Sequence, residues 1–214
     1  MSCVLNRKKL HYYLENVESF RNPKLELEQY CTSAHVAADI LFNIQMTDNA
    51  LENMSVADLG CGTGMLSIGA KLLGANCVFG FEIDTDAVSD FQSNLEAYEM
   101  MDDSINVTLC DVTRLFRDNK RKLVDTVILN PPFGTNPEKN GIDMAFLHVA
   151  LSIADSHVYS LHKTTTRNHV LRTIHNTGAE AKVVAELRFD LPRSYKRHRQ
   201  DTVDIAVDLV HSWF

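Results

Sequence analysis

Residues 56–66 read Val-Ala-Asp-Leu-Gly-Cys-Gly-Thr-Gly-Met-Leu, an apolar run that leads into a glycine loop and then into a second apolar stretch. Glycine lets the backbone adopt a positive φ and approach a ligand closely. In doubly wound α/β sheets, ligands lie beyond the carboxyl ends of the strands. The stretch therefore predicts a first strand, a cofactor-binding loop and a helix at 65–73.

The spacing of the glycines separates this loop from two common nucleotide-binding loops. A dinucleotide fingerprint needs G-x-G-x-x-G, but the sixth position is Met65 counted from Gly60 and Ser67 counted from Gly62. A phosphate loop needs a lysine after its last glycine, and Ala70 occupies that position. Neither a nicotinamide dinucleotide nor a nucleoside triphosphate is favoured.

Acidic residues follow the next two expected strands. The strand at 77–81 ends in Glu82, which could accept from both hydroxyls of a ribose, and the strand Ile105–Leu109 is followed by Asp111, which could accept from an adenine amino group. Each carboxylate alone would more often be a helix cap or a solvated loop charge. Their order after the glycine loop predicts a pocket for S-adenosylmethionine.

A fourth strand, expected at 123–129, runs directly into Asn130-Pro131-Pro132-Phe133. A carboxamide oxygen and a proline carbonyl can both accept from one NH2 group, while an aromatic ring stacks on the planar group that carries it. Proline has a fixed φ and no N–H, so these acceptors are preorganised. Alone, the motif would often be only a proline-rich turn. After the cofactor loop, it makes the chain look like a class I, Rossmann-like, S-adenosylmethionine-dependent amino methyltransferase.

That class has an α/β fold, a seven-stranded, mostly parallel sheet with helices on both faces and an antiparallel last strand. The remaining expected elements are helices at 86–99 and 144–152 and a strand at 157–160. Short strands that alternate with helical periods favour a parallel sheet. Alternation with period two at 181–189 and 202–210 predicts an antiparallel closing pair.

The first 50 residues differ in character from the rest. Helical spacing is found at 9–20 and 34–44, with an irregular stretch between them. We interpret residues 1–50 as an N-terminal helical lid on a catalytic core at 51–214. The 214 residues, 45% of them hydrophobic, fit a single domain.

Composition sets further expectations. The five cysteines form no C-x-x-C pair and the nine histidines no H-x-x-x-H or H-E-x-x-H grouping, which favours reduced thiols and no metal site. No stretch approaches the roughly 20 apolar residues of a membrane span, and the start lacks the apolar region of a signal peptide. We expect an intracellular protein with no membrane segment.

Several longer segments indicate the family more narrowly. They read Glu-Gln-Tyr-Cys-Thr at 28–32, Asn-Pro-Pro-Phe-Gly-Thr at 130–135, Gly-Ile-Asp-Met-Ala-Phe at 141–146, Tyr-Ser-Leu-His-Lys at 159–163 and Leu-Arg-Phe-Asp-Leu-Pro at 187–192. With them the chain resembles, essentially end to end, the methyltransferase-like protein 5 family, the adenine-N6 methyltransferases of small-subunit (18S) ribosomal RNA. It departs from the family's usual proline at Cys31, cysteine at Thr63 and aspartate at Glu82.

The resemblance implies roles for individual residues. Gln29 and Thr32 would close over the cofactor, S-adenosylmethionine, and an adenosine flipped out of its RNA would enter the pocket of Asn130, Pro131, Pro132 and Phe133, the expected catalytic set. No general base is needed, so no histidine is given a catalytic role. The expected cofactor-binding set is Gln29, Thr32, Asp58, Gly60, Gly62, Thr63, Gly64, Met65, Glu82, Ile83, Asp111, Val112 and Asn130.

The resemblance also implies partners and a location. The family works as a heterodimer with a small zinc-binding activator subunit, expected on Ile105–Leu109 because a bare edge strand can take up a strand of another chain. A covered edge or a homodimer would also satisfy the sequence. The implied substrate is small-subunit ribosomal RNA, and the expected location is the nucleus, the nucleolus and the cytoplasm.

The net charge of −7 at first argues against RNA binding. Basic residues nevertheless gather between the last two expected strands, around Tyr195, where they could contact phosphates, although such a run is more often a solvated loop. The expected RNA-binding set is Lys163, Arg193, Tyr195, Lys196, Arg197 and Arg199.

Two other function classes remain open. Asn-Pro-Pro with an aromatic residue also suits enzymes that methylate glutamine side-chain amides at N5, because that NH2 group is likewise conjugated. The chain could also be a non-catalytic ribosome-assembly factor with a methyltransferase fold. The intact glycine loop and Asn130 argue against this second alternative.

Overall fold

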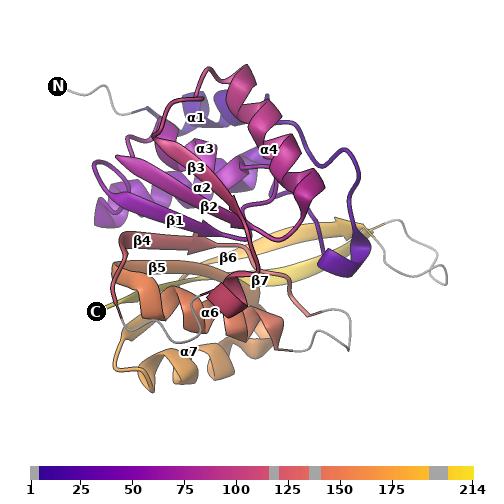
Figure 1. The fold of residues 1–214 in the computed structure, drawn as a ribbon. Coiled ribbons are helices and arrows are strands. Elements are labelled where there is room, and N and C mark those ends of the chain that lie inside the picture. The colour runs from indigo at the N-terminus through magenta and orange to yellow at the C-terminus, as the bar shows by residue number, and fades with distance from the viewer. Residues whose placement is uncertain (1–4, 116–120, 135–140, 193–201) are drawn as a thin grey trace.

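The computed structural model describes residues 5–115, 121–134, 141–192 and 202–214 (Figure 1). These residues form one seven-stranded sheet in the order β3-β2-β1-β4-β5-β7-β6. The strands are β1 (Ser55–Leu59), β2 (Cys77–Glu82), β3 (Ile105–Leu109), β4 (Val124–Leu129), β5 (Ala154–Lys163), β6 (Glu180–Pro192) and β7 (Thr202–Trp213). Neighbours from β3 to β5 pair in parallel, and β7 is antiparallel to both β5 and β6. The predicted class I sheet, with its antiparallel last strand, is confirmed.

Helices cover both faces of the sheet (Figure 1). They are α1 (Arg7–Leu14), α2 (Ala34–Asp48), α3 (Met65–Leu72), α4 (Thr85–Ala97), α5 (Val112–Leu115), α6 (Ile142–Ile153) and α7 (Arg167–His175), with short 3-10 turns η1 (Leu25–Leu27) and η3 (Thr164–Thr166). In the described part of the chain, no helix is both long enough and apolar enough to cross a bilayer.

The central strands are apolar on both sides, as is usual for parallel strands buried between two helical layers. In β1, Val56 belongs to the apolar cluster formed with α1 to α4, whereas Ala57 and Leu59 belong to the cluster formed with α6 and α7. Leu10 and Leu14 of α1 are fully buried in the first cluster. Helix α1 is therefore packed as part of the core.

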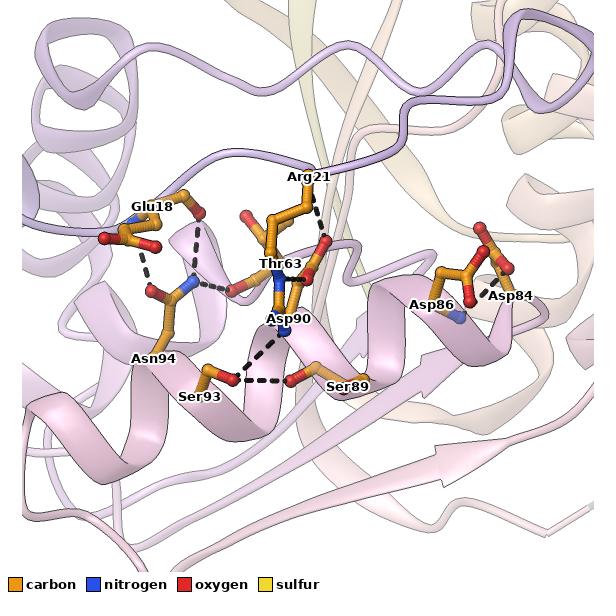
Figure 2. Close-up of polar contacts among 9 residues, drawn as sticks. All are labelled: Glu18, Arg21, Thr63, Asp84, Asp86, Ser89, Asp90, Ser93 and Asn94. Atoms are coloured by element: carbon orange, nitrogen blue, oxygen red, sulfur yellow. Dashed lines mark hydrogen bonds and ion pairs between the residues drawn. The ribbon is translucent and has the colours of Figure 1, made fainter.

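The helix predicted for residues 9–20 is wrong beyond Leu14. In place of further helical turns, the backbone of Glu18 is hydrogen-bonded to the side-chain amide of Asn94 on α4. The Asn94 Oδ1 accepts from the Glu18 N–H at 3.0 Å, and the Asn94 Nδ2 donates to the Glu18 carbonyl at 3.0 Å (Figure 2). A side chain 76 positions away thus satisfies backbone groups that a helix would have satisfied internally.

Other elements are longer than the sequence indicated. The strand expected at 157–160 spans Ala154–Lys163, because β7 pairs with it as far as Lys163. Helix α6 begins at Ile142, directly after Gly141. The sequence analysis did not identify α5 and α7, although Val170 and Ile174 of α7 are buried at helical spacing.

Candidate active site

A cavity of about 520 Å³ opens at the carboxyl ends of β1, β2 and β4. Residues at the strand ends and residues of the N-terminal segment both line it. The strand-end residues include Gly60, Gly62, Glu82, Ile83, Asp111, Val112 and Asn130, and the N-terminal ones are Phe20, Leu27, Glu28, Gln29 and Tyr30. A smaller hollow beside it is lined by Thr32, Asp58, Thr63 and Met65, among others.

The glycine loop needs its glycines for two reasons. Gly60, Gly62 and Gly64 have φ of 74°, 54° and 91°, a region that side chains rarely adopt. A Cβ at Gly62 would also lie 2.8 Å from the ring of Phe20, and one at Gly64 2.3 Å from the ring of Phe91. The first two glycines face the cavity, whereas Gly64 is placed against α4 and lines neither hollow.

Glu82 links the end of β2 to the glycine loop. Its Oε2 accepts from the Gly62 N–H at 3.0 Å, and its Oε1 accepts from the N–H groups of Ile83 at 2.8 Å and Asp84 at 3.0 Å. Burial raises the pKa of Glu82, and these three hydrogen bonds oppose that shift. The carboxylate therefore shapes the loop as well as facing the cavity, which leaves it fewer lone pairs for a ribose than the sequence suggested.

Asp58 is more deeply buried and faces α3. Its carboxylate accepts from the Ser67 hydroxyl at 2.6 Å. Burial raises the pKa of Asp58 to about 7, and the charge of Glu82 adds to the rise. Asp58 thus joins β1 to the helix that follows the loop.

Asp111 both caps a helix and lines the cavity. Its Oδ1 accepts from the Thr113 N–H at 3.1 Å and the Thr113 hydroxyl at 2.6 Å, and Arg114 lies 3.0 Å from its Oδ2. It therefore caps the short helix α5. It also lines the cavity next to Val112, so the cap and the ligand-facing position coexist.

The segment from residue 15 to residue 33, here called the N-terminal strap, docks on α4 through buried polar groups. Asn94, which holds Glu18, also donates to the Thr63 carbonyl at 2.9 Å (Figure 2). Asp90 forms an ion pair with Arg21 and accepts from its backbone N–H at 3.0 Å. Helix α4 thereby holds the strap and the glycine loop together.

Further along the strap, Gln29 faces the cavity with its amide already bonded. Its Nε2 donates to Asp84 at 2.7 Å, and its Oε1 accepts from the Lys24 N–H at 2.7 Å. The Lys24 ammonium pairs with Asp84 and lies 2.9 Å from Asp86. Burial alone would raise the pKa of Asp84, but Lys24 and Gln29 outweigh it and the pKa is lowered. This part of the strap is fixed to the start of α4.

The last part of the strap reaches the Asn-Pro-Pro-Phe loop. Asn130 Nδ2 donates to Thr32 Oγ1 at 2.9 Å, which uses one of the two N–H donors of the amide and turns the acceptor Oδ1 away from Thr32. The Phe133 N–H donates to Glu28 Oε2 at 2.8 Å. The Phe133 ring lies edge-to-face against Phe189 of β6, with centroids 6.2 Å apart. A third hollow adjoins these groups and is lined by Glu28, Tyr30, Asn130, Pro131, Pro132, Phe133 and Phe189.

The structure brings the expected cofactor set together. Every member except Gly64 lines the main cavity or the hollow beside it. The sequence analysis missed the aromatic walls Phe20, Tyr30 and Phe146 and the carboxylate of Glu28, although Glu28 opens one of the segments that carried the resemblance. Among the residues that the structure describes, no three His, Cys, Asp or Glu side chains gather as metal ligands.

The expected RNA-binding set is only partly placed. Lys163 is half-buried at the end of β5. The other members, Arg193, Tyr195, Lys196, Arg197 and Arg199, lie outside the described residues. Their contact with RNA stays a prediction.

The strand order, the glycine loop after β1 and the cavity at the strand ends define a class I, Rossmann-like methyltransferase. Over 97% of both chains, the fold matches the crystal structure of a candidate RNA methyltransferase from Pyrococcus horikoshii with a TM-score of 0.83 and 33% identity. A family model for ribosomal protein L11 methyltransferase (PrmA) matches residues 33–131.

More similar relatives identify the family. The chain is 48% identical over 203 residues to the rRNA N(6)-adenosine-methyltransferase METTL5 of Danio rerio, covering 95% of this chain and 96% of that protein. It is 45% identical over 204 residues to the Drosophila melanogaster rRNA N(6)-adenosine-methyltransferase, covering 95% and 94%. The chain belongs to the METTL5 family of rRNA N6-adenosine methyltransferases.

Proposed function

We propose that this protein transfers a methyl group from S-adenosylmethionine to N6 of an adenosine in small-subunit ribosomal RNA. The observation that carries the proposal is the hydrogen bond between Asn130 and Thr32, because it turns the Asn130 NH2 group toward Thr32 and leaves Oδ1 on the other side of the amide as an acceptor. An acceptor at that position suits an amino group as the incoming ligand. Membership of the METTL5 family supports adenine as its carrier.

The cavity supports the choice of cofactor. Its volume lies within the roughly 300–1,000 Å³ typical of small-molecule sites. Gly60 and Gly62, which carry no side chain, line the cavity, and the carboxylates of Glu82 and Asp111 face it too, which supports them as the groups that hold the ribose and the adenine. When bound, S-adenosylmethionine supplies an electrophilic methyl group on its sulfonium.

The protein's own part in the reaction is positioning. Asn130 Oδ1 and the Pro131 carbonyl accept from the N6 amino group, which frees the nitrogen lone pair for in-line attack. The ring of Phe133 stacks on the flipped base, and such stacking contributes roughly 1–3 kcal/mol. The proton of the methylated amine leaves afterwards to Asn130 or to water. Orientation and preorganised acceptors then supply most of the acceleration.

For the partner, we propose the small zinc-binding activator subunit on β3. This strand lies at the edge of the sheet, and Leu109 is half exposed there. An uncovered edge can pair with a strand of another chain. If the chain expressed alone is as soluble and stable as the chain co-expressed with the activator, this proposal is weakened.

Within residues 1–50 of the single domain, α1 packs in the core, and we propose that the strap acts as the lid. We also propose that the protein is found in the nucleus, the nucleolus and the cytoplasm, where small-subunit ribosomal RNA is made and used. A fluorescently tagged full-length chain, viewed beside a nucleolar marker, tests the location.

The main experiment incubates the purified chain, with and without the activator, with isotopically labelled S-adenosylmethionine and small-subunit ribosomal RNA. Mass spectrometry of the digested nucleosides is expected to show labelled N6-methyladenosine, lost in Asn130→Ala. Asn43→Ala, an exposed asparagine on α2, is the matched control and is expected to keep the activity.

The other outcomes separate the alternatives. Label in protease-sensitive, nuclease-resistant material would favour methylation of glutamine amides. Cofactor binding without methyl transfer to RNA or to protein would favour a non-catalytic assembly factor. Either result would overturn the proposal.

A further inference from the structure

Glu28 combines two features that are rarely found together. Its side chain is buried, with 7% exposure, and its backbone is left-handed, with φ 51° and ψ 44°, directly after η1. A residue with a side chain adopts this conformation at a cost in free energy, and such residues gather at functional sites. Glu28 also lines both the main cavity and the hollow at the Asn-Pro-Pro-Phe loop.

The partner of Glu28 in that loop is the backbone of Phe133. Pro131 and Pro132 have no N–H, so the N–H of Phe133 is the first donor that the loop offers after Asn130. Glu28 Oε2 accepts it at 2.8 Å, across 105 positions of sequence. Hydrogen bonds to a charged acceptor are shorter and stronger than neutral ones, and this one lies where water is largely excluded.

The part of the strap that carries Glu28 is also fixed to the start of α4. Gln29, the neighbour of Glu28, donates to Asp84, and Lys24 pairs with the same carboxylate. A backbone held on α4 therefore carries the carboxylate that holds Phe133. The ring of Phe133 is in turn held against Phe189, so the backbone and the ring of this residue have separate supports.

We infer that Glu28 is a positioning residue, which sets the place of Phe133 against the target base through its backbone N–H. The inference rests on the proposed function, because it assigns to Phe133 the task of stacking on adenine. It adds that the acceptor comes from the strap and not from the loop's own strand or helix. A displacement of about 1 Å at a positioning group can lower a rate about a hundredfold, so loss of this acceptor acts on turnover more than on cofactor binding.

The test compares three substitutions in the full-length chain. Glu28→Ala removes the acceptor, and Glu28→Gly repeats the removal with a residue that tolerates the left-handed backbone. Glu28→Gln keeps a carbonyl oxygen that can accept from the same N–H. The control is Glu26→Ala, which removes an exposed carboxylate two positions earlier in the strap.

Turnover is measured as labelled N6-methyladenosine formed, and cofactor affinity by calorimetry. We expect kcat to fall about tenfold or more in Glu28→Ala and Glu28→Gly, with the dissociation constant of the cofactor nearly unchanged. Glu28→Gln is expected to recover most of kcat. Unchanged kcat after removal of the acceptor, an equal fall in cofactor affinity, or no recovery in Glu28→Gln would each overturn the inference.

A second measurement does not depend on activity. Residues 131–133 contain a single exchangeable backbone amide, that of Phe133. Its hydrogen exchange is expected to speed up in Glu28→Ala and to stay slow in Glu28→Gln and Glu26→Ala. If the unsubstituted protein methylates no adenosine, the proposed function fails, and this exchange still decides whether Glu28 holds Phe133. Equal exchange in all variants would overturn the inference on its own.

Discussion

The glycine loop and the Asn-Pro-Pro-Phe loop follow adjacent parallel strands, β1 and β4, and they are held in different ways. The glycine loop is shaped by its own left-handed residues, by Glu82 at the end of β2 and by Phe91 on α4. The Asn-Pro-Pro-Phe loop is held by Thr32 and Glu28, about 100 positions earlier. The backbone of the glycine loop is thus held mainly by elements close to it in sequence. The Asn-Pro-Pro-Phe loop is held by the N-terminal strap, which also lines the main cavity through Phe20, Gln29 and Tyr30.

The strongest test of local determination is Gly64→Ala. A Cβ there would meet the ring of Phe91 at 2.3 Å in a left-handed backbone, so overpacking and strain add. We expect the free energy of unfolding to fall by about 2–5 kcal/mol, measured by chemical denaturation. Gly178→Ala, with φ 87° and nothing within 4 Å of the added Cβ, should lose only the strain, about 1–2 kcal/mol. Equal losses would show that Phe91 does not shape the loop.

Asn94→Ala probes a side chain that binds both the strap and the glycine loop. Its amide bonds the backbone of Glu18 in the strap and the carbonyl of Thr63 in the glycine loop, and it is 2% exposed. Leaving these groups without a partner is expected to cost about 2–3 kcal/mol of stability.

Cofactor affinity and turnover should both fall in Asn94→Ala, read by calorimetry and by methyl transfer. Gln92→Ala, exposed on the same helix, provides the comparison and should change neither. A loss confined to turnover would mean that the strap alone depends on Asn94.

Thr32→Val tests whether Thr32 serves the target side of the site or the cofactor side. Valine keeps the shape of threonine but cannot accept the hydrogen bond from Asn130 Nδ2. We expect kcat to fall about five- to tenfold, or about 1–1.4 kcal/mol, while cofactor affinity is retained. Thr32→Ser should restore kcat, and Thr47→Val, exposed on α2, should have no effect. A fall in affinity that matches the fall in kcat would instead assign Thr32 to the cofactor, as the sequence first suggested.

The same contrast explains which features could be predicted from the sequence. The sheet, the glycine loop and the order of polar residues at the strand ends were predicted because each depends on neighbours in sequence: periodicity, turn glycines and strand ends. The strand-end members of the cofactor set followed from them, whereas Gln29 and Thr32 were implied by the resemblance to the family. All of the set except Gly64 lines a hollow.

Contacts between distant residues could not be predicted in this way. The helix expected at 9–20 stops at Leu14 because Asn94 takes up the next backbone groups. Gln29 turned out to bond Asp84 as well as face the cavity. Glu28 went unnoticed because its partner, the N–H of Phe133, is a backbone group, and no pattern of residue types reveals which backbone N–H a carboxylate will meet.

The position of the N-terminal strap in the chain has a consequence for biosynthesis. The strap leaves the ribosome before the groups that it binds on α4 and after β4, which are made roughly 70 to 100 residues later. Contacts between residues so far apart form late, because the chain between them must first be ordered. The pocket for the target base and the part of the main cavity that the strap lines should therefore be among the last parts of the molecule to be completed.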